Sequence, residues 1–169
     1  VARELKARYR GSVLGFLWSF INPLLLLSIY TFVFTVVLPN RNPIAQPYAV
    51  FMFCGILPWN WFSSSLMEAS GSLVSGGNLI KKVLFPAEIL PIVNVLANMV
   101  HYFLGMLILV AFLIGYRHWP DPAGLLWFPV VILIQLVFTT GLALFLSALT
   151  VHYRDIRDLL SNLLMFWFF

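Results

Sequence analysis

The residues of this chain whose types and spacing could do chemistry are polar groups set inside long apolar runs. Asn94, Asn98 and His101 follow one another at spacings of four and three residues, so a helix would place them on one face. Such groups cost free energy against hydrocarbon, so this face should line either a helix bundle or a wet channel. Bundle hydrogen bonds of about 1 kcal/mol each are the simpler interpretation, and a channel lining is the alternative.

A second stripe of small and polar residues recurs every four positions in a later apolar run. It consists of Gln135, Thr139, Ala143 and Ser147. Small residues let helix backbones approach closely in a membrane, so we favour helix packing over a pore lining for this stripe.

Aromatic residues, which make up 17% of the chain, are a further candidate for ligand contact. A flat apolar ring can stack on the C–H face of a sugar while polar ring edges hydrogen-bond its hydroxyls. For any individual ring, contact with lipid or with the membrane interface is the simpler interpretation. The rings that we single out as candidates for glycan contact are Tyr30, Phe34, Trp59 and Trp61.

The stretch GNLIKKVLFPAEILP, residues 77–91, is charged although it lies between two apolar runs. Gly76 and Gly77 predict a turn, and Asn78 is a good N-cap for a short helix. Such a helix could dock in a partner's groove, with apolar side chains as anchors and lysines steering toward acidic groups. Lysines that merely flank a membrane span are the alternative. We predict a docking segment at residues 76–86, with contacts from Asn78, Leu79, Ile80, Lys81 and Lys82.

Residues 1–12 predict an amphipathic helix that lies on the membrane surface. Val1, Leu5 and Tyr9 recur every four positions with basic residues between them. Orientation of the chain by basic residues alone is an alternative of nearly equal weight. The basic residues of this predicted interface helix are Arg3, Lys6, Arg8 and Arg10.

Motifs for ATP hydrolysis or for metal binding are missing from the sequence. The pair Gly76 and Gly77 lacks the spacing of a phosphate-binding loop, and Cys54 is the single cysteine. Intramembrane carboxylate pairs, which ion-driven carriers usually place at mid-membrane, are not apparent either. We therefore expect no catalytic residue, no metal and no cofactor on this chain, and energy must come from a partner unless the protein is passive.

The elements that must position these residues are membrane helices. Only 9% of the residues are charged and 62% are hydrophobic, far from the composition of a soluble domain. Because a spanning helix needs about 20 apolar residues, we predict an all-α membrane protein, a polytopic transmembrane helical bundle that forms one domain over residues 1–169. Its four full spans and the start of a fifth, at which the domain is truncated, are predicted at residues 13–38, 48–67, 89–116, 125–151 and 157–169.

The ten Lys and Arg residues predict the orientation of the chain in the membrane. All except Arg41 and Arg117 fall on one side of the predicted spans. They lie in the N-terminal segment, at Lys81 and Lys82, and in residues 152–158. The positive-inside rule places that side, with the N-terminus, in the cytoplasm. Because the net charge of +4 is scattered rather than gathered in one patch, we expect no nucleic-acid partner.

Three segments together resemble the permease subunits of ABC-2 type exporters, most closely those of O-antigen, capsule and teichoic acid. They are KARYRGSVLGFLWSFINPLLLL, GILPWNWFSSSLMEASGSLVSGGNLIKKVLFPAEILP and LSALTVHYRDIRDLL, and the resemblance covers essentially all 169 residues. It implies a homodimer of six-span permeases in the bacterial plasma (inner) membrane. Two partner subunits would bind ATP and Mg, and the cargo would be an undecaprenyl-diphosphate-linked glycan.

The resemblance also assigns roles to two segments. It implies that residues 78–82 form the coupling helix on the ATPase and that residues 2–11 form an interface helix near the point where substrate enters. An ABC-2 exporter of a drug or small lipid, and a membrane scaffold without transport activity, are the alternatives.

Overall fold

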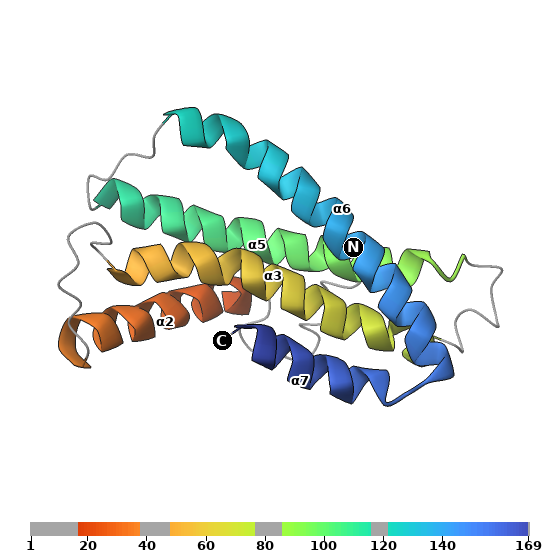
Figure 1. Ribbon diagram of the computed structural model, residues 1–169. Coiled ribbons are helices and arrows are strands. Elements are labelled where there is room, and N and C mark those ends of the chain that lie inside the picture. The colour runs from red at the N-terminus through yellow and green to blue at the C-terminus, as the bar shows by residue number, and fades with distance from the viewer. Residues whose placement is uncertain (1–16, 38–47, 77–85, 116–121, 169) are drawn as a thin grey trace.

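The computed structural model describes residues 17–37, 48–76, 86–115 and 122–168, and every regular element in those ranges is helical (Figure 1). The predicted interface helix with Arg3, Lys6, Arg8 and Arg10 and the predicted docking residues Asn78 to Lys82 lie outside the described residues. The all-α fold class is therefore confirmed for the part of the chain that is described. The elements are α2 (Trp18–Phe32), η2 (Val33–Val37), α3 (Tyr48–Ser75), α5 (Ile89–Gly115), α6 (Pro122–His152) and α7 (Ile156–Phe168).

Helix α3 is the centre of the bundle and packs against α2, α5, α6 and α7. In Figure 1, α2 lies along the first half of α3 and α7 lies along its second half. One core cluster joins α3 to α5, with Phe53, Leu57 and Trp61 packed against Tyr102 and Leu109. This cluster fixes the position of the helix that carries the predicted polar face.

In the part of the chain that the structure describes, two helices are long and apolar enough to cross a membrane. They are Ile89–Gly115, with a mean hydropathy of 2.1, and Gly124–His152, with a mean hydropathy of 2.3. Both meet the length of about 20 residues that a span requires. The predicted count of four full spans remains a prediction.

Helix α3 continues to Ser75, eight residues beyond the end of the predicted span at residue 67. The serine hydroxyls of this polar extension find their hydrogen-bond partners within the helix, because they donate to carbonyls of the preceding turn. Ser70 Oγ donates to the Met67 carbonyl at 2.8 Å, Ser72 Oγ to Ala69 at 2.7 Å and Ser75 Oγ to Gly71 at 2.9 Å. Glu68, which lies just beyond the predicted span, is a helical residue.

The small-residue stripe of α6 packs inside the bundle, which confirms the helix-packing interpretation. Thr139 and Ala143 are fully buried and Ser147 is 1% exposed. Gln135 Nε2 donates to the carbonyl of Pro58 at 2.8 Å, so this stripe also ties α6 to α3. The opposite side of α6 is exposed and apolar, which suits contact with lipid; it includes Leu126, Leu133, Ile134 and Val137.

Candidate functional site

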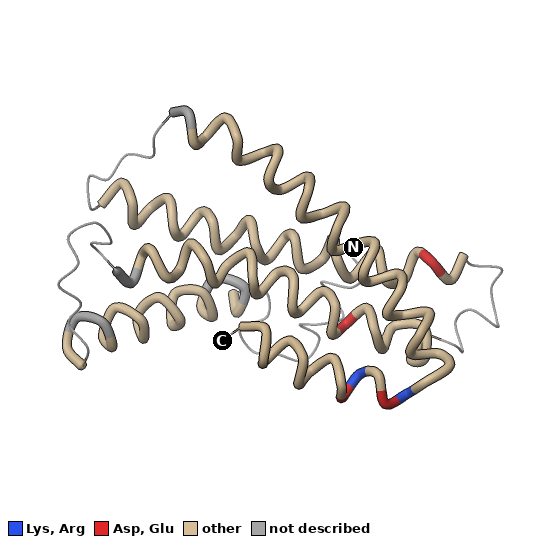
Figure 2. Tube along the Cα trace, in the orientation of Figure 1, with Lys and Arg blue, Asp and Glu red and all other residues tan. Residues whose placement is uncertain are grey.

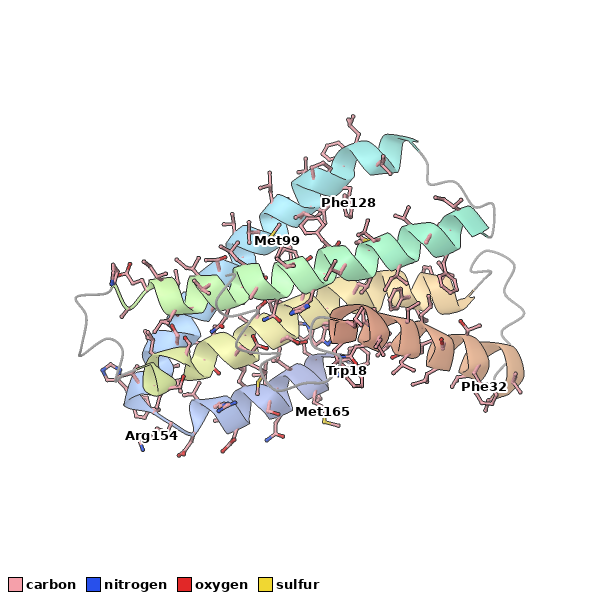
Figure 3. The ribbon with its side chains drawn as sticks, turned by 180° about the vertical axis from the view of Figure 1, so that it is seen from behind. Trp18, Phe32, Met99, Phe128, Arg154 and Met165 are labelled. Carbon is pink, nitrogen blue, oxygen red and sulfur yellow. The ribbon has the colours of Figure 1, made fainter. Side chains whose placement is uncertain are left out.

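An open groove of about 470 Å³ lies between α2, α3 and α7. Its wall combines rings, apolar side chains and a line of polar groups. The apolar and aromatic residues are Leu26, Tyr30, Ile56, Trp59, Met67, Leu164, Met165 and Phe168. The polar residues are Asn60, Ser63, Ser64, Glu68 and Ser161. Figure 3 labels Met165, which contributes to this wall from α7.

The polar line of the groove follows from the helical register of α3. Asn60, Ser64 and Glu68 are spaced by four residues, so their side chains lie above one another on one face of the helix. Ser161 faces this line from α7. Polar groups at this density are costly against lipid, so the groove is suited to hold a polar or hydrated ligand.

Glu68 is held at the groove wall by a hydrogen bond from α5. Asn98 Nδ2 donates to Glu68 Oε2 at 2.8 Å and to the carbonyl of Asn94 at 3.1 Å. Asn98 is 5% exposed and Asn94 is 9% exposed, so both lie within the bundle. This geometry supports the bundle interpretation of the predicted polar face. His101, half-buried one turn further on, does not lie on the groove wall.

The four aromatic candidates separate into different environments. Tyr30 and Trp59 line the groove. Trp61 is 2% exposed, donates from Nε1 to the carbonyl of Val95 at 3.2 Å and stacks on Tyr102 with ring centroids 5.1 Å apart. This position favours a packing role for Trp61. The side chain of Phe34 lies outside the described part of the structure.

Helix α7 adds a ring to the groove that sequence reasoning missed. Phe168 lies 5.7 Å from Trp59 between ring centroids, and Trp167 lies 6.2 Å from the same ring. Aromatic pairs at these separations attract one another and hold the Trp59 ring in place. The spacing along α3 could have revealed Asn60 and Ser64, but no local pattern shows that α7 returns to α3.

The start of α7 packs against α3 at a glycine, Gly71. A Cβ atom on Gly71 would lie 3.5 Å from Nη1 of Arg157, so the guanidinium group rests against this bare stretch of helix. The backbone N–H of Ile156 donates to the carbonyl of Tyr153 at 3.2 Å in the turn between α6 and α7. Together these contacts direct α7 back along α3, so that α7 forms the second wall of the groove.

Charged residues among those described gather toward one end of the bundle (Figure 2). They are Glu68, Glu88, Arg154, Asp155, Arg157 and Asp158. The part of the chain that the structure describes contains no group of three or more His, Cys, Asp or Glu that could hold a metal ion. The described wall of the groove is built from rings, apolar side chains, hydroxyls, an amide and one carboxylate.

Two long apolar helices, α5 and α6, and a groove with polar walls between α2, α3 and α7 are features of a helical membrane protein with a candidate path for a polar ligand. Comparison with known protein families identifies this class of membrane protein more specifically. Residues 1–169 match the ABC-2 type transporter family, and the chain belongs to that family.

Curated relatives match along nearly the whole chain. It is 44% identical over 169 residues to the O-antigen export system permease protein RfbA of Myxococcus xanthus, covering 100% of this chain and 64% of the relative. Two proteins of the same name from Klebsiella pneumoniae are each 34% identical over 167 residues, covering 99% of this chain and 63% of the relative. The chain thus spans less than two thirds of the length of these relatives.

Proposed function

We propose that this chain is the membrane domain of a permease subunit in an ATP-driven exporter, which moves a lipid-linked polysaccharide of the O-antigen type. The observation that carries the proposal is the 44% identity, over the whole chain, to a protein named as an O-antigen export permease. Membership of the ABC-2 type transporter family supports it independently. Export would proceed across the bacterial plasma membrane, with the N-terminus in the cytoplasm as the distribution of Lys and Arg predicts.

The groove supports a sugar cargo by its chemistry. The Trp59 ring offers an apolar face for the C–H side of a sugar, and its neighbours Asn60, Ser63 and Ser64 can donate to and accept from sugar hydroxyls. Such contacts are short-ranged and repeat with each sugar, so a chain can move past them one unit at a time.

The partners of the permease follow from the same proposal. A separate ATP-binding subunit would bind ATP and Mg and hydrolyse the nucleotide, and it would dock on Asn78, Leu79, Ile80, Lys81 and Lys82. Two copies of the permease would enclose the path of an undecaprenyl-linked glycan, and the segment with Arg3, Lys6, Arg8 and Arg10 would lie at the membrane surface.

Export in cells tests the function and the groove together. In a host that lacks its own permease gene, the full-length wild-type permease should restore polysaccharide to the cell surface. Trp59→Ala should lower that export several-fold, because the variant loses the apolar ring face on which a sugar would stack. Trp127→Ala is the matched control, since Trp127 is 65% exposed on α6 and lies outside the groove.

The outcomes separate the candidate functions. If export is restored and Trp59→Ala does not change it, the transport function stands, but the groove does not lie on the path of the glycan. A permease that reaches the membrane, assembles with its ATP-binding subunit and restores no polysaccharide would point to another cargo, such as a drug or a lipid.

A further inference from the structure

Trp167 of α7 contacts the groove ring Trp59 from outside the groove. The described wall takes Leu164, Met165 and Phe168 from α7, but it does not include Trp167. The Trp167 ring meets the Trp59 ring in a T-shaped arrangement, with ring centroids 6.2 Å apart and ring planes at 73°. Trp167 therefore reaches the groove through Trp59 rather than by contact with a ligand.

A buried ring supports Trp167 from a second direction. Trp167 meets Phe62 of α3 edge to face, with ring centroids 5.8 Å apart and ring planes at 85°. Phe62 is 7% exposed and stacks in turn on Phe138 of α6, with ring centroids 6.0 Å apart. Because a ring in a close-packed interior has little room to move, Phe62 gives Trp167 a fixed support that rings of three helices share.

The orientation of the Trp59 ring depends on the rings around it, because Trp59 is half-buried and borders the groove. Phe62 and Phe168 lie 5.8 Å and 5.7 Å from it between ring centroids. A sugar stacks on the face of a ring, so the direction of that face decides whether the contact forms. Without Trp167, the Trp59 side chain loses a neighbour that limits its choice of rotamer.

We propose that Trp167 is a positioning residue for the glycan, which keeps the Trp59 ring oriented for stacking and thereby raises the affinity of the groove for a sugar chain. The inference rests on the proposed function and adds a residue that acts on the cargo without touching it. One aromatic pair changes an equilibrium constant about two- to tenfold. Loss of the Trp167 ring should therefore weaken binding of the glycan by about that factor.

Glycan-stimulated ATP hydrolysis measures this effect. The full-length permease and its ATP-binding subunit are reconstituted in proteoliposomes and titrated with lipid-linked glycan from the same cells. Trp167→Leu should raise the glycan concentration for half-maximal stimulation about two- to tenfold, and should lower the maximal stimulated rate by a smaller factor. Trp167→Phe retains a ring and should recover most of the loss. Phe166→Leu is the matched control at the neighbouring position, where the side chain is 85% exposed, and should behave like the wild type.

A double variant shows whether Trp167 acts through Trp59. If it does, Trp167→Leu has no further effect in a Trp59→Ala background, because the ring that it positions is gone. Two residues that contribute independently would give multiplied effects instead. If Trp167→Leu does not assemble with the ATP-binding subunit, Trp167→Met takes its place in the same cycle, since methionine fills irregular space with a flexible apolar chain and has no ring.

The outcomes separate this inference from the proposed function. Wild-type half-maximal concentrations in Trp167→Leu, or multiplied effects in the double variant, would overturn the positioning role while glycan stimulation of the wild type remains. A Trp59→Ala variant that responds to glycan as the wild type does would overturn it as well. An assembled wild-type complex that no glycan stimulates would reject the proposed function, and the inference with it.

Discussion

Glu68 and Asn98 connect the interior of the bundle to the groove. The carboxylate is on the groove wall, and the amide that holds it is 5% exposed within the bundle. The hydrogen bond between Asn98 Nδ2 and Glu68 Oε2, 2.8 Å long, therefore joins α5 to the candidate site on α3. At this scale, one residue pair combines a packing contact with a candidate ligand-binding group.

Loss of this amide should destabilise the protein. Asn98→Ala leaves the Glu68 carboxylate without its donor from α5, and interhelical hydrogen bonds in membrane proteins are worth on the order of 1 kcal/mol. Thermal unfolding of the full-length permease in detergent should show a lower midpoint for Asn98→Ala. Asn162→Ala, at an exposed position of α7, should leave the midpoint close to that of the wild type. Equal midpoints for the two variants would show that the bond contributes nothing measurable.

Helices α3 and α5 make a tight contact at a glycine. A Cβ atom on Gly105 would lie 2.5 Å from Cδ2 of Leu57. Leu57 is 6% exposed and packs in the same core cluster as Trp61 and Tyr102, so it has little room to move. This contact sets the distance between the helix that carries Glu68 and the helix that carries Asn98.

A larger residue at this contact should force the helices apart. Gly105→Val is expected to lower the free energy of unfolding by about 1 to 3 kcal/mol, the usual cost of overpacking a core. Gly115→Val is the control on the same helix, because a Cβ there meets nothing within 4 Å. The two variants are compared by thermal unfolding of the full-length permease. A midpoint for Gly105→Val at or above that of Gly115→Val would contradict the close approach.

Helical periodicity in the sequence predicted which segments form helices better than it predicted where those helices end. The apolar runs predicted helices around α3, α5 and α6, but the predicted span ended at residue 67 because the polar residues from Glu68 to Ser75 interrupt the apolar pattern. For the site, the aromatic pattern included Tyr30 and Trp59 but could not distinguish them from the buried Trp61. That distinction depends on Val95 and Tyr102, which are more than 30 residues away in sequence.

At the scale of the whole molecule, the described charges lie toward one end and the exposed apolar surface covers the helices. The charged end includes Glu88 before α5 and the turn between α6 and α7 (Figure 2). Residues 77–85, which the structure does not describe, connect α3 to the segment just before α5 at that end. The predicted ATPase-docking residues fall within this connection.

Charge reversal in this connection should weaken assembly of the exporter. Lys81→Glu combined with Lys82→Glu should reduce co-purification of the ATP-binding subunit with the full-length permease at least several-fold, because steering lysines become repulsive toward acidic groups. Arg41→Glu combined with Arg117→Glu is the matched reversal on the predicted opposite side of the membrane and should leave co-purification unchanged. Equal recovery of the subunit with both double variants would argue against docking at Lys81 and Lys82.

The central claim is that this membrane domain serves ATP-driven export of a lipid-linked polysaccharide. The most direct test is the ATPase activity of the full-length permease reconstituted with its ATP-binding subunit, measured with and without lipid-linked glycan from the same cells. We predict that the glycan stimulates ATP hydrolysis several-fold and that Trp59→Ala reduces this stimulation. A stable complex whose ATPase activity is the same with and without the glycan would contradict the account.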